Sequence, residues 1–156
     1  MNCRSHQFHV RDLTILSLCI LLFVPSAFAG PKEDASQVVE RWAKAFTEAD
    51  VDTITGLYAT DAVFIGTGSK AIVTKTEDIK KYFQGALLGS RRFVATFVES
   101  VVTSASETTV VVTAMDKLAM TVDGKTTDLF GRVTFVLAKG DSGWKIVSFH
   151  RSAMPA

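Results

Sequence analysis

Apolar residues in the first half of the chain recur at spacings of three and four, which is typical of helices with one buried face. The first such stretch covers 38–49, with Trp42 near its centre, and Asp50 or Asp52 can cap a short second helix after it. A third stretch, 79–87, has the same spacing. The pattern therefore predicts two helices that meet at a corner, followed later by a third helix.

Strand-like patterns occupy most of the remaining positions. Two short apolar runs, 61–65 and 71–73, precede the third helix and are separated by a glycine-rich turn. The second half of the chain contains four long runs rich in Val, Thr and Phe, which favour strands: 93–102, 108–122, 129–137 and 144–155. Asp123-Gly124 and 139–143 provide turns for hairpins between the later runs. The predicted order, α-α-β-β-α-β-β-β-β, indicates an α+β domain whose helices cover one face of an antiparallel sheet.

Apolar side chains are predicted on both faces of the long strands. Val112 and Leu118 share one face of their strand, while Val111 and Met115 lie on the other, and Phe130 likewise opposes the main apolar face of the next strand. A sheet face in contact with water should be polar. The helices can cover only one face, so we expect a second copy to cover the other, giving a homodimer or a larger homo-oligomer. Scattered surface valine is the alternative interpretation.

The first 29 residues have the pattern of a secretory signal peptide. Arg4 and Arg11 precede an apolar run, 13–24, and Ala27-Phe28-Ala29 provides a cleavage site after Ala29. The apolar run is shorter than the roughly twenty residues that a membrane-spanning helix needs, although an uncleaved anchor is the alternative. We therefore expect residues 30–156 to form one domain that is exported to the periplasm or secreted, with no membrane attachment after cleavage.

Charge and cysteine content narrow the function of residues 30–156. This part carries 15 basic and 15 acidic side chains, so it has no net charge to attract nucleic acid or anionic lipid. Both cysteines, Cys3 and Cys19, precede it, so a packed core without disulfides must hold the fold. No His, Cys or carboxylate cluster has the spacing of a metal site. Gly66-Thr67-Gly68 lacks the third glycine of a dinucleotide-binding loop, and no cofactor is expected.

Four segments carry a resemblance to a known superfamily. They are Leu57–Ala62 after the helical corner, Gly131–Phe135, Trp144–Val147 and Phe149–Pro155. With this order of elements the chain resembles nuclear transport factor 2-like (cystatin-like) domains. Within them it resembles the association domain of calcium/calmodulin-dependent kinase II and its secreted bacterial, SnoaL-like relatives. The resemblance implies a cone-shaped, curved sheet with a deep cavity between sheet and helices, association through the outer sheet face, and arginines in the cavity.

Arg132 is the leading candidate for a ligand-binding residue. The resemblance matches it to a cavity arginine, and a guanidinium in an apolar strand needs a carboxylate or a ligand, since burying it unpaired costs on the order of several kcal/mol. We expect Arg132 to line the cavity and to favour an anionic ligand group. The alternative is a structural ion pair with Asp61, Asp116 or Asp128. The preceding strand offers Asp116 and Lys117 but no second arginine, which departs from the family pattern.

Four further residues are candidates for the site. His150 is the only histidine in 30–156 and is suited to acid–base chemistry. Only one of His150 and Arg151 can enter the cavity, because neighbours in a strand point to opposite sides. Tyr58 and Asp61 resemble the proton-transfer pair of isomerases in this superfamily, and their alternative roles are core and turn. Trp42 is expected to be core or cavity wall.

Taken together, these features favour an exported module that binds an unknown small molecule, associates with itself, or does both. A small enzyme of the same fold is the alternative: an isomerase, cyclase or hydrolase that uses His150 or the pair Tyr58 and Asp61 as acid and base. The two interpretations differ in the cavity, because an enzyme needs a titrating carboxylate or histidine that faces it.

Overall fold

The computed structural model describes residues 30–155, and the predicted signal peptide lies outside the described residues. The helices are α1 (Pro31–Glu48), α2 (Val51–Gly56) and α3 (Thr76–Leu87). The strands are β1 (Tyr58–Ile65), β2 (Arg92–Ser106), β3 (Thr109–Val122), β4 (Lys125–Gly140) and β5 (Gly143–Ala153). The predicted order is confirmed. The expected short strand at 71–73 consists of one β-bridge, between Val73 and Phe64.

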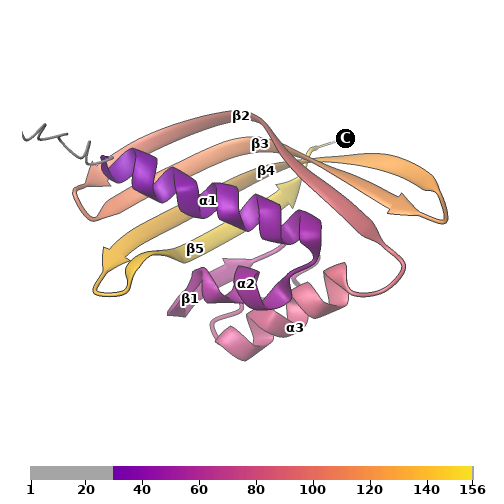
Figure 1. Cartoon of the computed structure of the whole chain (residues 1–156), viewed down its shortest axis with the longest axis horizontal. Helices are drawn as coiled ribbons and strands as arrows, with labels where there is room; N and C mark the ends of the chain where they lie inside the picture. Colours follow the sequence, from indigo (N-terminus) through magenta and orange to yellow (C-terminus); the bar gives the residue numbers. More distant parts are fainter. Residues whose placement is uncertain (1–29, 156) are drawn as a thin grey trace, which may run out of the picture.

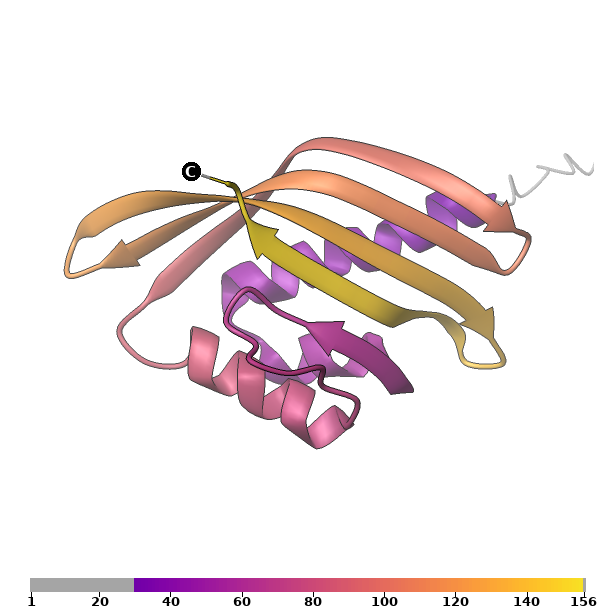
Figure 2. The ribbon, with the colours of Figure 1, turned by 180° about the vertical axis from the view of Figure 1, so that it is seen from behind.

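The strands form one curved sheet in the order β1-β5-β4-β3-β2. All neighbours are antiparallel except β1 and β5, which are parallel. Helix α1 lies across the concave face, and α2 and α3 lie beside β1 at one edge (Figure 1). From behind, the convex face of the long strands carries no helix (Figure 2). No helix among residues 30–155 has the length and apolar character that crossing a membrane requires.

The corner between α1 and α2 follows from its local sequence. Helix α1 ends at Glu48, and its C-cap residue Ala49 adopts a left-handed conformation with φ of 56°. Asp50 then caps α2, because its Oδ1 atom accepts a hydrogen bond of 2.9 Å from the backbone N–H of Thr53. The hydrogen bonds from Thr53 lower the pKa of Asp50. The turn directs α1 along the sheet and α2 toward α3, so a space remains between the helices and the sheet.

Aromatic rings fill most of that space. The indole of Trp42 lies 5.0 Å from the ring of Phe46, 5.3 Å from Phe135 and 5.4 Å from Phe149, centroid to centroid. Its Nε1 atom donates a hydrogen bond of 3.0 Å to the hydroxyl of Tyr58. Trp42 thus lies at the centre of the core, and its indole N–H satisfies the buried hydroxyl of Tyr58.

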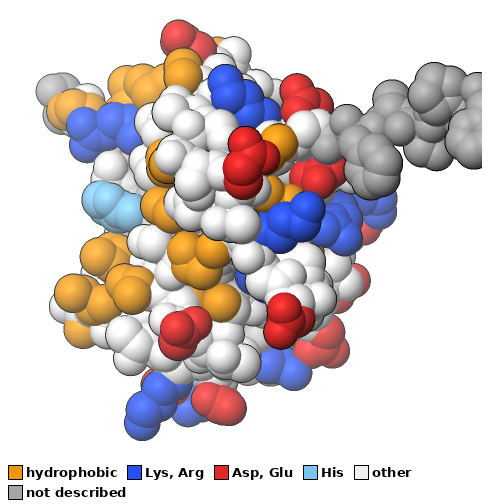
Figure 3. Space-filling view, turned by 90° about the vertical axis from the view of Figure 1, so that its left-hand side faces the viewer, with side chains coloured by type: hydrophobic (Ala, Val, Ile, Leu, Met, Phe, Trp, Pro, Cys, Tyr) orange, Lys and Arg blue, Asp and Glu red, His pale blue; other side chains and the backbone are white. Residues whose placement is uncertain are grey.

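The convex face of the sheet exposes apolar side chains over β2, β4 and the C-terminal end. We call these residues the outer apolar patch: Val94, Val98, Val101, Phe130 and Met154. A view from the side shows hydrophobic side chains gathered along the left-hand edge, which lies at the back in Figure 1 (Figure 3). The predicted apolar character of both faces is therefore present in the structure.

Candidate functional site

A cavity of about 160 Å³ lies between the concave face of the sheet, α1 and α3. Its walls come from both helices, from four strands and from the loop after β1: Trp42, Phe46, Gly66, Thr67, Tyr82, Phe83, Ala86, Phe93, Leu118, Leu129, Phe149 and Arg151. Eight of these residues are aromatic or aliphatic with large side chains, and one is charged. A cavity of about 150 Å³ can hold a benzene molecule, so this one suits a compact organic molecule.

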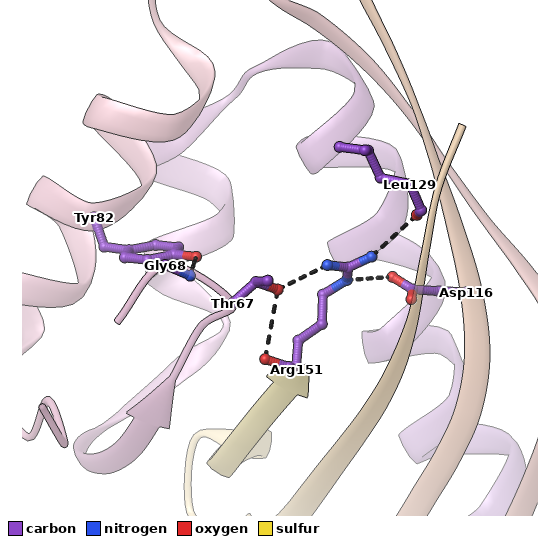
Figure 4. A network of polar contacts seen from close by, with 6 residues as sticks. All are labelled: Thr67, Gly68, Tyr82, Asp116, Leu129 and Arg151. Carbon is purple, nitrogen blue, oxygen red and sulfur yellow. Dashed lines mark hydrogen bonds and ion pairs between the residues drawn. The ribbon is translucent and has the colours of Figure 1, made fainter. Parts of the chain in front are cut away.

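Arg151 is the charged residue of this wall, and it is held on three sides. Its Nε atom donates to Asp116 Oδ2 at 2.7 Å, Nη1 to Thr67 Oγ1 at 2.7 Å, and Nη2 to the carbonyl oxygen of Leu129 at 3.2 Å (Figure 4). The residue is only 7% exposed. A guanidinium has five N–H groups, so two remain without a partner among the described residues. Arg151 is therefore fixed in position and still able to donate.

Gly131 provides the room for this ion pair. It lies opposite Asp116 on β3 and opposite Ala153 on β5. A Cβ atom at this position would lie 2.5 Å from Asp116 Oδ1 and 2.6 Å from Arg151 Cζ. The glycine therefore lets the guanidinium cross the inner face of β4 to reach the carboxylate, a close approach that explains a glycine inside a strand.

Asp116 balances the charge of Arg151 but keeps one free oxygen. Its residue exposure is 3%, and its Oδ1 atom has no hydrogen-bond partner within residues 30–155. A buried ion pair is stable only when its geometry is good and its remaining polar atoms are satisfied. Asp116 Oδ1 is therefore a buried, unpaired acceptor behind the cavity wall, and Asp116 contributes its negative charge to the surroundings of Arg151.

The loop Gly66-Thr67-Gly68 joins Arg151 to α3. The Thr67 hydroxyl accepts from Arg151 Nη1 and donates to the backbone carbonyl of Arg151 at 3.5 Å. The backbone N–H of Gly68 donates to the hydroxyl of Tyr82 at 3.3 Å (Figure 4). The sequence excluded this glycine pair as a nucleotide loop, and the structure places it where its threonine holds the cavity arginine.

Arg132 does not line the cavity, which corrects the prediction from the sequence. Its neighbours Gly131 and Val133 are buried and face inward, so Arg132 points outward and is exposed. It donates one long hydrogen bond of 3.4 Å, to the carbonyl oxygen of Ala153. The carboxylates proposed as its partners lie elsewhere: Asp116 pairs with Arg151, and Asp128 pairs with Lys117 at 3.3 Å.

His150 is also exposed on the outer face, between the buried Phe149 and Arg151. The structure therefore answers the open question of which residue enters the cavity, and it is Arg151. A β-bulge explains why the sequence pattern alone did not show which of the two residues faces inward. Val136 pairs with Ser148 but Leu137 pairs with Ile146, so Val147 is an extra residue in β5. The alternation that starts at Trp144 changes phase there and turns Phe149 and Arg151 inward.

Tyr58 and Asp61 are not brought together as an acid–base pair. The Tyr58 side chain is buried, and burial raises the pKa of its hydroxyl well above the usual value. Its hydroxyl accepts the bond from Trp42, whereas Asp61 is exposed on β1. Of the five predicted site residues, only Trp42 lines the cavity. The described cavity wall contains no histidine or carboxylate side chain.

Comparisons with known proteins agree with this architecture. The profile of the SnoaL-like domain family matches residues 35–156. A candidate calcium/calmodulin dependent protein kinase II association domain from Xanthomonas campestris is 27% identical, with a TM-score of 0.71, covering 79% of this chain and 87% of that one. A search of curated proteins found no match.

Two solved structures of lower identity share the fold. A ketosteroid isomerase-like protein from Erwinia carotovora atroseptica has a TM-score of 0.71 at 18% identity, covering 83% of this chain and all of that one (100%). A candidate dehydratase of the nuclear transport factor 2-like family from Streptomyces avermitilis has a TM-score of 0.72 at 15% identity, covering 80% and 96%. The predicted superfamily and fold class are confirmed.

Proposed function

Because the chain belongs to the SnoaL-like domain family and encloses an apolar cavity with one fixed arginine, we propose that it binds a small, largely apolar molecule there. The cavity between sheet and helices is the observation that carries this proposal. Small-molecule sites are typically apolar hollows with a few polar groups that orient the ligand. In this chain the aromatic walls would supply affinity, and the two free N–H groups of Arg151 would orient an oxygen atom of the ligand.

The arrangement supports binding more than acid–base catalysis. A general acid or base must lie within hydrogen-bond reach of the substrate, and the candidates that the sequence offered lie on the outer face, on an exposed part of β1 or against Trp42. The neighbours described as isomerase-like or as a dehydratase share the fold at under 25% identity. Their similarity therefore concerns the fold and not the activity, and the cavity itself favours binding.

Binding can be tested with a small probe and a variant that fills the cavity. We expect benzyl alcohol to change the intrinsic fluorescence in a saturable way, because Trp42 lines the cavity. In Ala86→Phe the added ring should occupy the cavity and abolish the response. Gln84→Phe places the same ring on the exposed side of α3 and serves as the control. A wild-type protein with no saturable response, or an Ala86→Phe variant with an unchanged one, would contradict the proposal.

We further propose that the outer apolar patch is covered by a second copy of this chain. Val98 is 64% exposed and Val101 is 61% exposed, which is unusual for neighbouring apolar side chains on one sheet face. Glu99, Met115 and Arg132 lie in register across β2, β3 and β4. A two-fold axis near Met115 would bring Glu99 of one copy to Arg132 of the other. Self-complementary charge thus favours a homodimer over an unrelated partner.

A further inference from the structure

The charges at the end of the cavity point to the chemical class of its ligand. We propose that the cavity selects an uncharged molecule, with a carbonyl, amide or hydroxyl head, over a carboxylate or phosphate of similar size. Asp116 is the residue that sets this preference. The inference rests on the proposed binding function and adds the ligand class to it. This preference is the opposite of the one expected for an unpaired cavity arginine, which would favour an anionic ligand.

The first argument is charge balance. Arg151 is the one charged side chain in the described cavity wall, and Asp116 lies 2.7 Å from its Nε atom. Both side chains are more than nine-tenths buried. An anionic ligand would place two negative charges beside one positive charge, away from water, and would lose its own hydration. A neutral ligand avoids both costs.

The second argument is that no other cation reaches the site within residues 30–155. Arg132 points to the opposite face of the sheet, and Lys117 pairs with Asp128. Arg91 and Arg92, which precede and begin β2, are exposed and donate to backbone carbonyls of residues 85–91. Asp116 neutralises the positive charge of Arg151, and the described cavity wall contains no second arginine and no lysine that would supply another positive charge.

The third argument is the set of hydrogen bonds still available. Arg151 retains two N–H groups that can donate to a carbonyl or hydroxyl oxygen. The oxygen atom of a primary amide or an alcohol can accept from these groups without bringing a charge. Asp116 is not part of the cavity wall, so it acts on the ligand through its charge and not through a direct hydrogen bond. A carboxylate has acceptors only, and Asp116 repels it.

Benzamide and benzoate test the inference, because they have the same shape and differ in charge at pH 7. We expect the wild-type protein to bind benzamide at least about tenfold more tightly than benzoate in calorimetric titrations, since the cavity desolvates the carboxylate without a free cation. Asp116→Asn keeps the shape of the side chain and removes its charge, so Arg151 becomes uncompensated. In this variant the preference should reverse in favour of benzoate.

Asp128→Asn is the matched control, because it removes a carboxylate from a partly exposed ion pair between β3 and β4. It should leave the benzamide preference unchanged, and melting curves should show that each variant is folded. A wild-type protein that binds benzoate as tightly as benzamide overturns the inference, even if Asp116→Asn fails to fold. If benzyl alcohol binds while benzoate is not disfavoured, the binding function stands without the selectivity. If none of the three probes binds, the binding function fails as well.

Discussion

Arg151 and Arg132 lie on adjacent strands of the same sheet, yet they occupy opposite environments. The side chain of Arg151 faces the cavity and is fixed by a carboxylate, a hydroxyl and a carbonyl oxygen. That of Arg132 lies on the convex face, where it makes one long hydrogen bond and remains exposed. The charge is the same, but burial makes Arg151 a structural part of the cavity, whereas Arg132 stays exposed on the convex face. The two sheet faces should therefore respond differently to substitution.

The largest difference in the free energy of unfolding is expected between substitutions of two carboxylates, Asp116 in the buried ion pair and Asp128 in the partly exposed one. Asp116→Ala leaves the guanidinium of Arg151 buried and uncompensated, which should lower the free energy of unfolding by about 3–5 kcal/mol. Asp128→Ala breaks the partly exposed pair with Lys117 and should cost less than about 1 kcal/mol. Urea denaturation of both variants measures the two values. Equal losses would show that Arg151 is not the buried partner that the geometry indicates.

A smaller effect is expected on the outer face, in association and not in folding. Val98→Glu places a charge in the outer apolar patch and should weaken self-association by at least about tenfold, or about 1.4 kcal/mol. Ile72→Glu is a suitable control, because Ile72 is equally exposed, at 65%, but lies outside the sheet. Sedimentation equilibrium over a range of concentrations compares them. A wild-type protein that stays monomeric at tens of micromolar (on the order of weak association), or equal effects of the two variants, would exclude this interface.

The smallest effect concerns Tyr58 and pH. Because burial raises the pKa of Tyr58 in the folded state, the unfolded chain loses this proton first as pH rises. The contribution of Tyr58 to the free energy of unfolding is constant below the pKa of the unfolded chain, near 10.0. Above that pH the free energy of unfolding falls as pH increases. The loss should be about 0.4 kcal/mol at pH 10 and larger above it. Tyr58→Phe should remove this component, so a pH profile of unfolding identical to that of the wild type would contradict the assignment.

The sequence predicted the fold well because its elements depend on local periodicity. The stripe around Trp42, the acidic cap at Asp50 and the turn at Asp123-Gly124 each determine a short segment without reference to the rest of the chain. These signals were enough for the order of elements, whereas the superfamily was indicated by the resemblance of four segments: Leu57–Ala62, Gly131–Phe135, Trp144–Val147 and Phe149–Pro155.

The site was predicted less well, because it depends on strand phase and on pairing between distant residues. The bulge at Val147 changes which side of β5 faces the cavity, and no residue in 144–150 marks it. Asp116 was correctly considered as the partner of an arginine, but of Arg132 instead of Arg151. Gly131 carried the missing signal, since a glycine inside a long strand indicates that another group crosses it closely.

The extra residue at Val147 also has a consequence for the evolution and engineering of this scaffold. The bulge lets Ile146 before it and Phe149 and Arg151 after it all face the interior while β5 stays paired with β4. If β5 kept its length but paired without the bulge, its register beyond Ile146 would slip by one residue, so His150 would face the helices and Arg151 would face solvent. A protein of this shape can thus exchange an arginine for a histidine in its interior by losing a bulge, without a substitution in the cavity itself.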